Sequence, residues 1–327
     1  MATAIGALPH TDVDDAVAFV LDRAPRLPFA PRLPRRSPLE YKVAQVVHGV
    51  PGVTVEDDGS ITVDASSFDP GAVDATTPLA GDAFTGALAL LDALKAAAYR
   101  GPVKLQLGGP VTVGLAFVHA GVRARDALTG AAHVVASRAH GLIAAARDRL
   151  PDSPLVVLLD EPGLAAAGHP GFPLDTEPTI DLLSGALAAI EPAISGVHCC
   201  SGTEWSTAVQ AGASVLSMPL EQSVLDDASL LSTFLDEGGW IAWGAVPVTG
   251  PVGTDPDPLW RRLTGVWCDL TRAGVDPLQL RKHSLVTPAC GLDRHGPSQA
   301  ELAMDLCGAL ADRVHDQALA TRLSVGA

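Results

Sequence analysis

A histidine and a cysteine stand two residues apart at His198 and Cys200, directly after a short apolar run. On a β-strand, residues i and i+2 point to the same face. These two side chains are therefore expected to project together, while Cys199 points the other way. Imidazole nitrogen and thiolate sulfur are the ligand types that zinc prefers. The pair alone does not separate a metal site from ordinary packing, because a buried cysteine also serves as a small apolar residue.

A second cysteine, Cys290, follows another strand-like run much later in the chain and precedes Gly291. A structural zinc site usually has four ligands at tight Cys-x-x-Cys spacing, which this chain lacks. Three ligands drawn from distant strand ends, with one coordination position open, are typical of a catalytic metal site. The sequence therefore predicts a zinc ion held by His198, Cys200 and Cys290.

The composition narrows the classes of partner. The net charge of −15 disfavours binding to nucleic acid or to an anionic membrane surface. The five cysteines are sparse and odd in number, which fits a reducing cytoplasm better than a disulfide scaffold. The first residues have no signal-peptide pattern, and no apolar run is long enough to span a membrane. We therefore expect a cytoplasmic protein without nucleic-acid or membrane partners.

Short apolar runs alternate with longer helical patterns along the chain, which favours an α/β fold with a parallel sheet. A hairpin is expected near residues 53–63, because Asp57-Asp58-Gly59 lies there between β-branched residues. The fold expected is a single (β/α)8 TIM barrel domain over residues 1–327. Its eight strands are expected near residues 3–8, 27–33, 103–107, 154–159, 194–200, 213–218, 240–246 and 284–287.

The active site of such a barrel lies at the C-terminal ends of its strands. The clearest buried strand, residues 154–159, ends in Asp160 and Glu161, and a charge in that position is typical of parallel-sheet enzymes. Asp160 is predicted to bind an ammonium group through a charge-assisted hydrogen bond. The alternative for Asp160 is a helix N-cap.

Five motifs resemble, in order and spacing, the catalytic barrel of cobalamin-independent methionine synthase. The wider group also includes coenzyme M methyltransferases and uroporphyrinogen decarboxylase. The similarity covers nearly the whole chain, which is as long as the C-terminal half of the synthase and so resembles a stand-alone core form. The motifs are Ile5-Gly6-Ala7-Leu8-Pro9-His10-Thr11, Gly109-Pro110-Val111-Thr112, Leu159-Asp160-Glu161-Pro162, His198-x-Cys200 and Pro288-Ala289-Cys290-Gly291-Leu292.

The resemblance implies a zinc ion that binds the thiol substrate and is ligated by a histidine, two cysteines and a glutamate. Three of these ligands match His198, Cys200 and Cys290. The family glutamate aligns with Pro219, so Glu221, two residues further on, is the nearest replacement.

The resemblance also implies substrate-binding roles for Asp160, Glu161, Gly6 and Ala7. Asp160 matches the family aspartate that holds the amino group of homocysteine. Ala7 stands where the family has a serine that contacts the substrate carboxylate, so a thiol other than homocysteine stays open.

The function implied is S-methyl transfer to a thiol in methionine biosynthesis, most directly from homocysteine to methionine. The resemblance implies an activity like that of a 5-methyltetrahydropteroyltriglutamate–homocysteine S-methyltransferase. The donor is left open between a methylcorrinoid, its carrier protein and methyl-folate, because the N-terminal half of the family is absent from this chain.

Two other functions fit the same expected fold. A decarboxylase of the uroporphyrinogen type needs no metal but needs arginines for several carboxylates, and Arg32, Arg35 and Arg36 are the cluster available. A barrel that binds a thiol or a metal without catalysis is the second alternative, since Ala7 and Pro219 depart from the family pattern.

Overall fold

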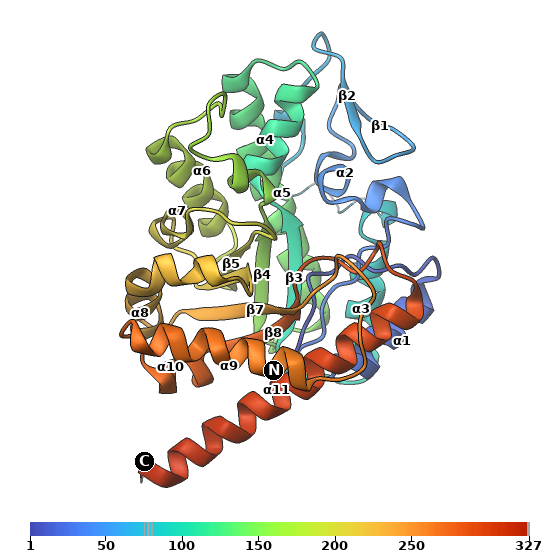
Figure 1. Cartoon of the computed structure of the whole chain (residues 1–327). Coiled ribbons are helices and arrows are strands. Elements are labelled where there is room, and N and C mark those ends of the chain that lie inside the picture. Colours follow the sequence, from blue (N-terminus) through green and yellow to red (C-terminus); the bar gives the residue numbers. More distant parts are fainter. Residues whose placement is uncertain (75, 77–78, 80, 326–327) are drawn as a thin grey trace.

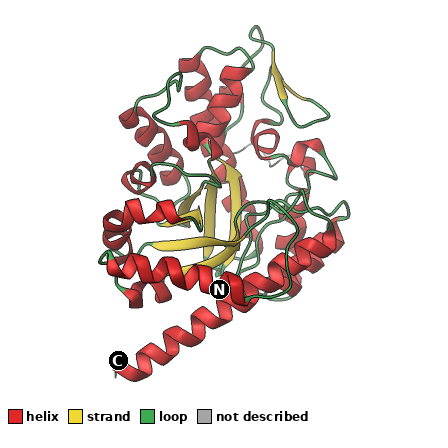
Figure 2. Cartoon of the chain, viewed as in Figure 1, coloured by secondary structure: helices red, strands yellow, loops and turns green. Residues whose placement is uncertain are grey.

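The computed structural model describes residues 1–74, 76, 79 and 81–325. A curled parallel sheet of six strands lies at its centre, in the order β3-β4-β5-β6-β7-β8, with helices packed around it (Figure 1, Figure 2). The strands are β3 (Val103–Gly108), β4 (Leu155–Asp160), β5 (Ile194–His198), β6 (Val215–Pro219), β7 (Trp240–Val246) and β8 (Ser284–Pro288). The fold is therefore mixed α/β, as the alternating pattern of the sequence predicts.

The helices follow the strands along the chain and form the outer layer (Figure 2). The α-helices are α1 (Val13–Arg23), α2 (Lys42–Val47), α3 (Thr85–Ala96), α4 (Pro110–His119), α5 (Ala124–Arg149), α6 (Thr176–Ala188), α7 (Trp205–Gln210), α8 (Ala228–Asp236), α9 (Asp257–Arg272), α10 (Pro277–Lys282) and α11 (Pro297–Val325). Short 3-10 turns lie at η1 (Pro38–Glu40), η2 (Pro70–Ala72), η3 (Gly81–Ala83), η4 (Pro162–Ala166) and η5 (Gln222–Asp227). Among the described residues, no helix combines the length and apolarity needed to cross a bilayer.

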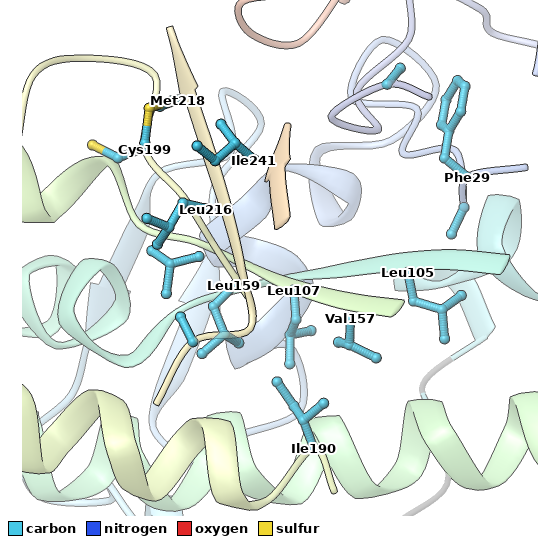
Figure 3. Close-up of a cluster of buried hydrophobic side chains, with 14 of the residues drawn as sticks. Phe29, Leu105, Leu107, Val157, Leu159, Ile190, Cys199, Leu216, Met218 and Ile241 are labelled. Atoms are coloured by element: carbon cyan, nitrogen blue, oxygen red, sulfur yellow. The ribbon is translucent and has the colours of Figure 1, made fainter. Parts of the chain in front are cut away.

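Alternation along the strands divides the core between the two faces of the sheet. Leu105 and Leu107 of β3, with Val157 and Leu159 of β4, point toward the helices and Ile190 (Figure 3). The intervening residues point to the inside of the curl, because successive side chains of a strand face opposite ways. A small apolar cluster fills that inner side, consisting of Leu27, Val156, Leu158, Val215, Ala242 and Leu285.

The expected hairpin is present. Strands β1 (Val53–Val55) and β2 (Ile61–Val63) pair in antiparallel register, with Val53 opposite Val63. They lie beside α2 and α4, away from the central sheet (Figure 1). The prediction of a surface excursion near residues 53–63 is confirmed.

The two N-terminal strands expected at residues 3–8 and 27–33 are not formed as strands. These segments instead make isolated parallel bridges, Ala2 to Val286, Ala7 to Arg32 and Phe29 to Lys104. Backbone hydrogen bonds accompany them, including Thr3 N–H to Val286 O at 3.1 Å and Lys104 N–H to Pro28 O at 2.8 Å. Six of the eight expected strands are therefore present in the described chain, and the other two segments lie between β8 and β3 as extended chain.

Local chemistry explains why these two segments stop short of regular pairing. Gly6 adopts a φ of +132°, which interrupts the pleat of the first segment. Pro28 and Pro31 have no N–H group, so the second segment loses ladder hydrogen bonds at those positions.

Candidate metal centre

Three polar residues of the site lie in register on neighbouring strands of the sheet. Asp160 of β4 pairs in register with His198 of β5, and His198 pairs with Ser217 of β6. Neighbouring strands lie about 4.8 Å apart, and residues paired in register share a face. All three side chains are buried. Asp160 and His198 are the last residues of their strands, and Ser217 lies two residues before the end of β6.

The His198 ring is held from one side only. Its Nδ1 atom lies 3.0 Å from Ser217 Oγ, whereas the buried Nε2 atom has no hydrogen-bond partner among the described residues. An orphaned buried nitrogen is unusual, because nearly all buried polar atoms have a partner. The ring is therefore oriented by Ser217 and has Nε2 available for a ligand.

Cys200 and Cys290 complete a three-residue cluster with His198. The ligand atoms of the three residues all lie within 4.8 Å of one another. Cys200 follows the end of β5 and Cys290 follows the end of β8, and both thiols are half-buried. The convergence of these three residues, predicted from their strand-end positions, is confirmed.

The contact between the two thiols shifts their pKa values in opposite directions. The Cys290 thiol hydrogen-bonds to Cys200, and this contact lowers the pKa of Cys200 to about 7. The same contact, assisted by burial, raises the pKa of Cys290 to about 12. Of the two thiols, Cys200 therefore loses its proton more readily than Cys290.

Cys199 lies on the other side of the chain, as the alternation predicts. It is fully buried in the apolar core next to Met218 (Figure 3). Burial raises the pKa of its thiol, which is consistent with a packing residue.

Asp160 forms an ion pair inside the fold. Its Oδ2 atom accepts a hydrogen bond from Arg32 Nη2 at 2.5 Å, and the two side chains are 1% and 4% exposed. Burial acts to raise the pKa of Asp160. The positive charges of Arg32 and His198, with weaker help from Lys42 and Lys104, hold it below its usual value. Asp160 is therefore an ion-pair partner and the last residue of its strand, and its side chain does not cap a helix.

Glu161 supports a helix. Its carboxylate accepts hydrogen bonds from Val111 N at 2.8 Å, Thr112 N at 2.8 Å and Thr112 Oγ1 at 2.6 Å, all in the first turn of α4. Burial raises the pKa of Glu161 to about 7 against the opposing effect of these bonds. The side chain proposed for substrate binding thus fixes the start of α4 to the end of β4.

Gly6 and Ala7 have different positions relative to the site. A Cβ on Gly6 would stand 2.1 Å from Gln106 Nε2, so the absence of a side chain lets Gln106 pass. Gln106 accepts from Lys104 Nζ at 3.0 Å beneath the site, and burial lowers the pKa of Lys104 to about 7. Ala7, in contrast, lines the cavity over the cysteines.

That cavity has a volume of about 780 Å³ and opens above the cluster. Its walls include Ala7, Arg32, Lys42, His198, Cys200 and Cys290. Of the arginine cluster expected for a decarboxylase, only Arg32 lines it. Arg36 is bound to Glu40 at 2.8 Å, and Arg35 is exposed.

Glu221 lies apart from the three ligands. It is exposed and lines a separate cavity of about 420 Å³ together with Glu204, Asp226 and Asp227. The cluster of potential ligands in the described residues comprises His198, Cys200 and Cys290 only. The structure thus brings together three of the four predicted ligands and places the fourth elsewhere.

Sequence reasoning missed Ser217 and the pairing of Arg32 with Asp160. Ser217 precedes Pro219 by two residues on an expected strand, and its position opposite His198 becomes visible only once the register is known. Arg32 is expected at a strand end, but no local pattern specifies which acid it contacts.

One nitrogen and two sulfur donors at an open cavity can hold a soft or borderline divalent cation and leave one position for a ligand from the cavity. Neither a family model nor a curated protein matches the chain.

Proposed function

We propose that this protein is a zinc-dependent thiol methyltransferase whose most direct reaction is the conversion of homocysteine to methionine. The observation that carries the proposal is the convergence of His198, Cys200 and Cys290 within 4.8 Å at an open cavity. The cluster lies at the C-terminal edge of a parallel sheet, where α/β enzymes place their active sites.

The residues present fit a zinc ion. Zinc bonds of about 2.3 Å to sulfur and 2.0 Å to nitrogen put tetrahedral ligands about 3.5–3.8 Å apart. The observed spread of up to 4.8 Å needs only a small contraction. The unpartnered Nε2 of His198 supplies the nitrogen, and Ser217 on Nδ1 acts as the second-layer contact that usually orients such a ring.

The chemistry follows from the low nucleophilicity of free thiols, whose pKa is about 8.5. A bound zinc ion would ionise the substrate thiol at neutral pH. Cys200 and Cys290 would contribute two negative charges as thiolates, which keeps the site about neutral and preserves the nucleophilicity of the substrate sulfur. The cavity would give a methyl donor access to that sulfur, and the donor's leaving group would depart with the electron pair of the broken bond to the methyl group.

We also propose that the two N-terminal segments close the six-stranded sheet into a (β/α)8 barrel. The parallel bridges from Ala2 to Val286, from Ala7 to Arg32 and from Phe29 to Lys104 link β8 to β3 through the two N-terminal segments. Leu27 also packs with residues of β4, β6, β7 and β8 on the inner face. These contacts support the assignment of the two segments to the positions of the first and second strands of the barrel.

The partners follow from the reaction class. The acceptor is a small thiol, and the donor is a methylcorrinoid, its carrier protein or methyl-folate. All five cysteines are free, which supports a reducing, cytoplasmic setting.

Metal content tests the proposal directly. We expect about one zinc per chain in freshly purified, reduced protein, and a loss of that zinc in Cys290→Ser, because two remaining ligands bind zinc far more weakly than three. Cys268→Ser is the matched control, since Cys268 is exposed on α9 away from the cluster.

The zinc-loaded protein should then transfer a methyl group to homocysteine from at least one of the donors named. Protein that binds no zinc would contradict the methyltransferase and leave the decarboxylase as the next candidate. Protein that binds zinc and transfers no methyl group would instead favour a barrel that binds without catalysis.

A further inference from the structure

The wall of the site presents cations that the proposed chemistry does not use. Arg32 is almost fully buried and contacts Asp160 through Nη2, while its Nε and Nη1 atoms have no hydrogen-bond partner in the part of the chain that the structure describes. A buried guanidinium with two free donors is incompletely satisfied, and its fork geometry matches a carboxylate. Arg32 also lines the cavity over the cysteines.

A second cation lies at the same wall. Lys42, the first residue of α2, lines the cavity, and its side chain forms no ion pair or hydrogen bond in the described part of the chain. Arg32, Cys200 and Cys290 line the same cavity, so Lys42 faces the space between the thiol cluster and the Arg32 ion pair.

Two acidic groups at the wall, Asp160 and Glu40, are already matched. Asp160 is paired with Arg32, and Glu40 accepts from Leu33 N and from Arg36, each at 2.8 Å. Asp293 also lines the cavity. Asp160 retains one oxygen, Oδ1, that has no hydrogen-bond partner within the described ranges. An ammonium group that approached this oxygen would also approach the Arg32 charge.

We infer that Arg32, with Lys42, binds the carboxylate of the thiol substrate and that this carboxylate, not an amino group, determines substrate choice. The inference rests on the proposed function, since it needs a thiol held at the cysteine cluster. Asp160 then acts as a positioning residue that holds the Arg32 guanidinium. The substrate class is the mercapto-carboxylates, of which homocysteine is one member and its analogue without the amino group is another.

The position of Arg32 suits this role. Its partner Asp160 is the register neighbour of the ligand His198, and adjacent strands lie about 4.8 Å apart. A carboxylate at Arg32 therefore lies within the length of a short carbon chain from a sulfur at the cluster. A contact between Arg32 and the carboxylate would also replace the carboxylate contact that Ala7, which has no hydroxyl group, cannot make.

Three thiols separate the two charged groups of homocysteine. Homocysteine has both, 4-mercaptobutyrate lacks the ammonium group, and 3-mercaptopropylamine lacks the carboxylate. Their binding to the zinc-loaded protein is measured by titration calorimetry. We expect loss of the carboxylate to weaken binding about tenfold to a hundredfold, as for a lost charged hydrogen bond, and loss of the ammonium group to weaken it less than about threefold.

Variants locate the effect. Lys42→Gln and Arg32→Gln should each weaken binding of 4-mercaptobutyrate and leave 3-mercaptopropylamine unchanged. Lys95→Gln is the matched control, because Lys95 is exposed on α3. It should leave the binding of both thiols unchanged. Lys42→Gln keeps the test decisive if Arg32→Gln fails to fold.

The outcomes distinguish this inference from the function beneath it. If all three thiols bind with equal affinity, or if the ammonium group is needed as much as the carboxylate, the inference is overturned and the thiol site stands. If none of the three binds to the zinc-loaded protein, the proposed function is overturned and the inference falls with it.

Discussion

Replacing Arg32 by Met removes one half of a buried ion pair. The variant leaves the Asp160 carboxylate 1% exposed with no paired cation. Breaking such a pair from one side costs about 3–5 kcal/mol, because the remaining charge stays desolvated. For 327 residues, with an unfolding entropy of about 2.1 cal/mol/K per residue, this corresponds to a fall in Tm of about 4–7 °C.

The loss should depend on pH in a direction that the structure fixes. In the native protein the pKa of Asp160 is lowered, so the group stabilises the fold above its unfolded pKa of about 3.9. That contribution is lost as pH falls through the folded value. Without Arg32, burial dominates and raises the pKa of Asp160, so ionisation then opposes folding. The difference in unfolding free energy between the wild type and Arg32→Met should be largest near pH 7.5 and should become smaller as the pH is lowered toward 4.

Thermal unfolding of both proteins across this pH range is the assay. Arg100→Met is the matched control, because Arg100 and Asp152 form a pair at 2.8 Å with side chains 72% and 71% exposed. Such a pair contributes at most about 1 kcal/mol. A loss in Arg32→Met that is no larger than the control, or that is the same at every pH, would refute the reasoning.

Two further substitutions test the support of the site. Ser217→Ala removes the hydrogen bond that the described residues provide to His198 Nδ1. It should weaken zinc binding about tenfold to a hundredfold, measured by competition with a chromophoric chelator. An unchanged affinity would contradict the orienting role of Ser217. Gly6→Ala places a Cβ against Gln106 at a φ of +132° and should cost about 1–3 kcal/mol in denaturant unfolding. Gly265→Ala, in open space on helix α9, should stabilise the protein by up to about 1 kcal/mol, and a similar loss at both glycines would contradict the steric explanation.

The six central strands could be predicted from the sequence because each is a short apolar run that stops at a polar or turn residue. The strand at 154–159 was expected one residue from its observed bounds, Leu155–Asp160. The N-terminal segments could not be assigned correctly in the same way. An apolar run resembles a strand in sequence even where prolines or a left-handed glycine prevent regular pairing. Whether it pairs depends on the neighbouring segment of the same chain.

The cysteine cluster could be predicted because strand ends of one parallel sheet meet at one edge. The roles of Glu161 and Arg32 could not, since both depend on contacts between distant segments. Glu161 bonds to a helix that begins far earlier in the chain, and Arg32 reaches across to Asp160. The position of Glu221 depends on the path of the loop after β6, which strand patterns do not describe.

The three candidate ligands are not attached to equally rigid parts of the molecule. His198 belongs to a strand with neighbours on both sides, so its backbone opens only when the sheet itself opens. Cys200 and Cys290 lie just beyond strand ends, and the pairing of β7 with β8 already shifts register between Gly244 and Val246. An ion held there would thus exchange by release of its sulfur ligands first, with the imidazole as the fixed anchor. Exchange of the metal would then follow the local opening of two loops and not the global unfolding of the protein.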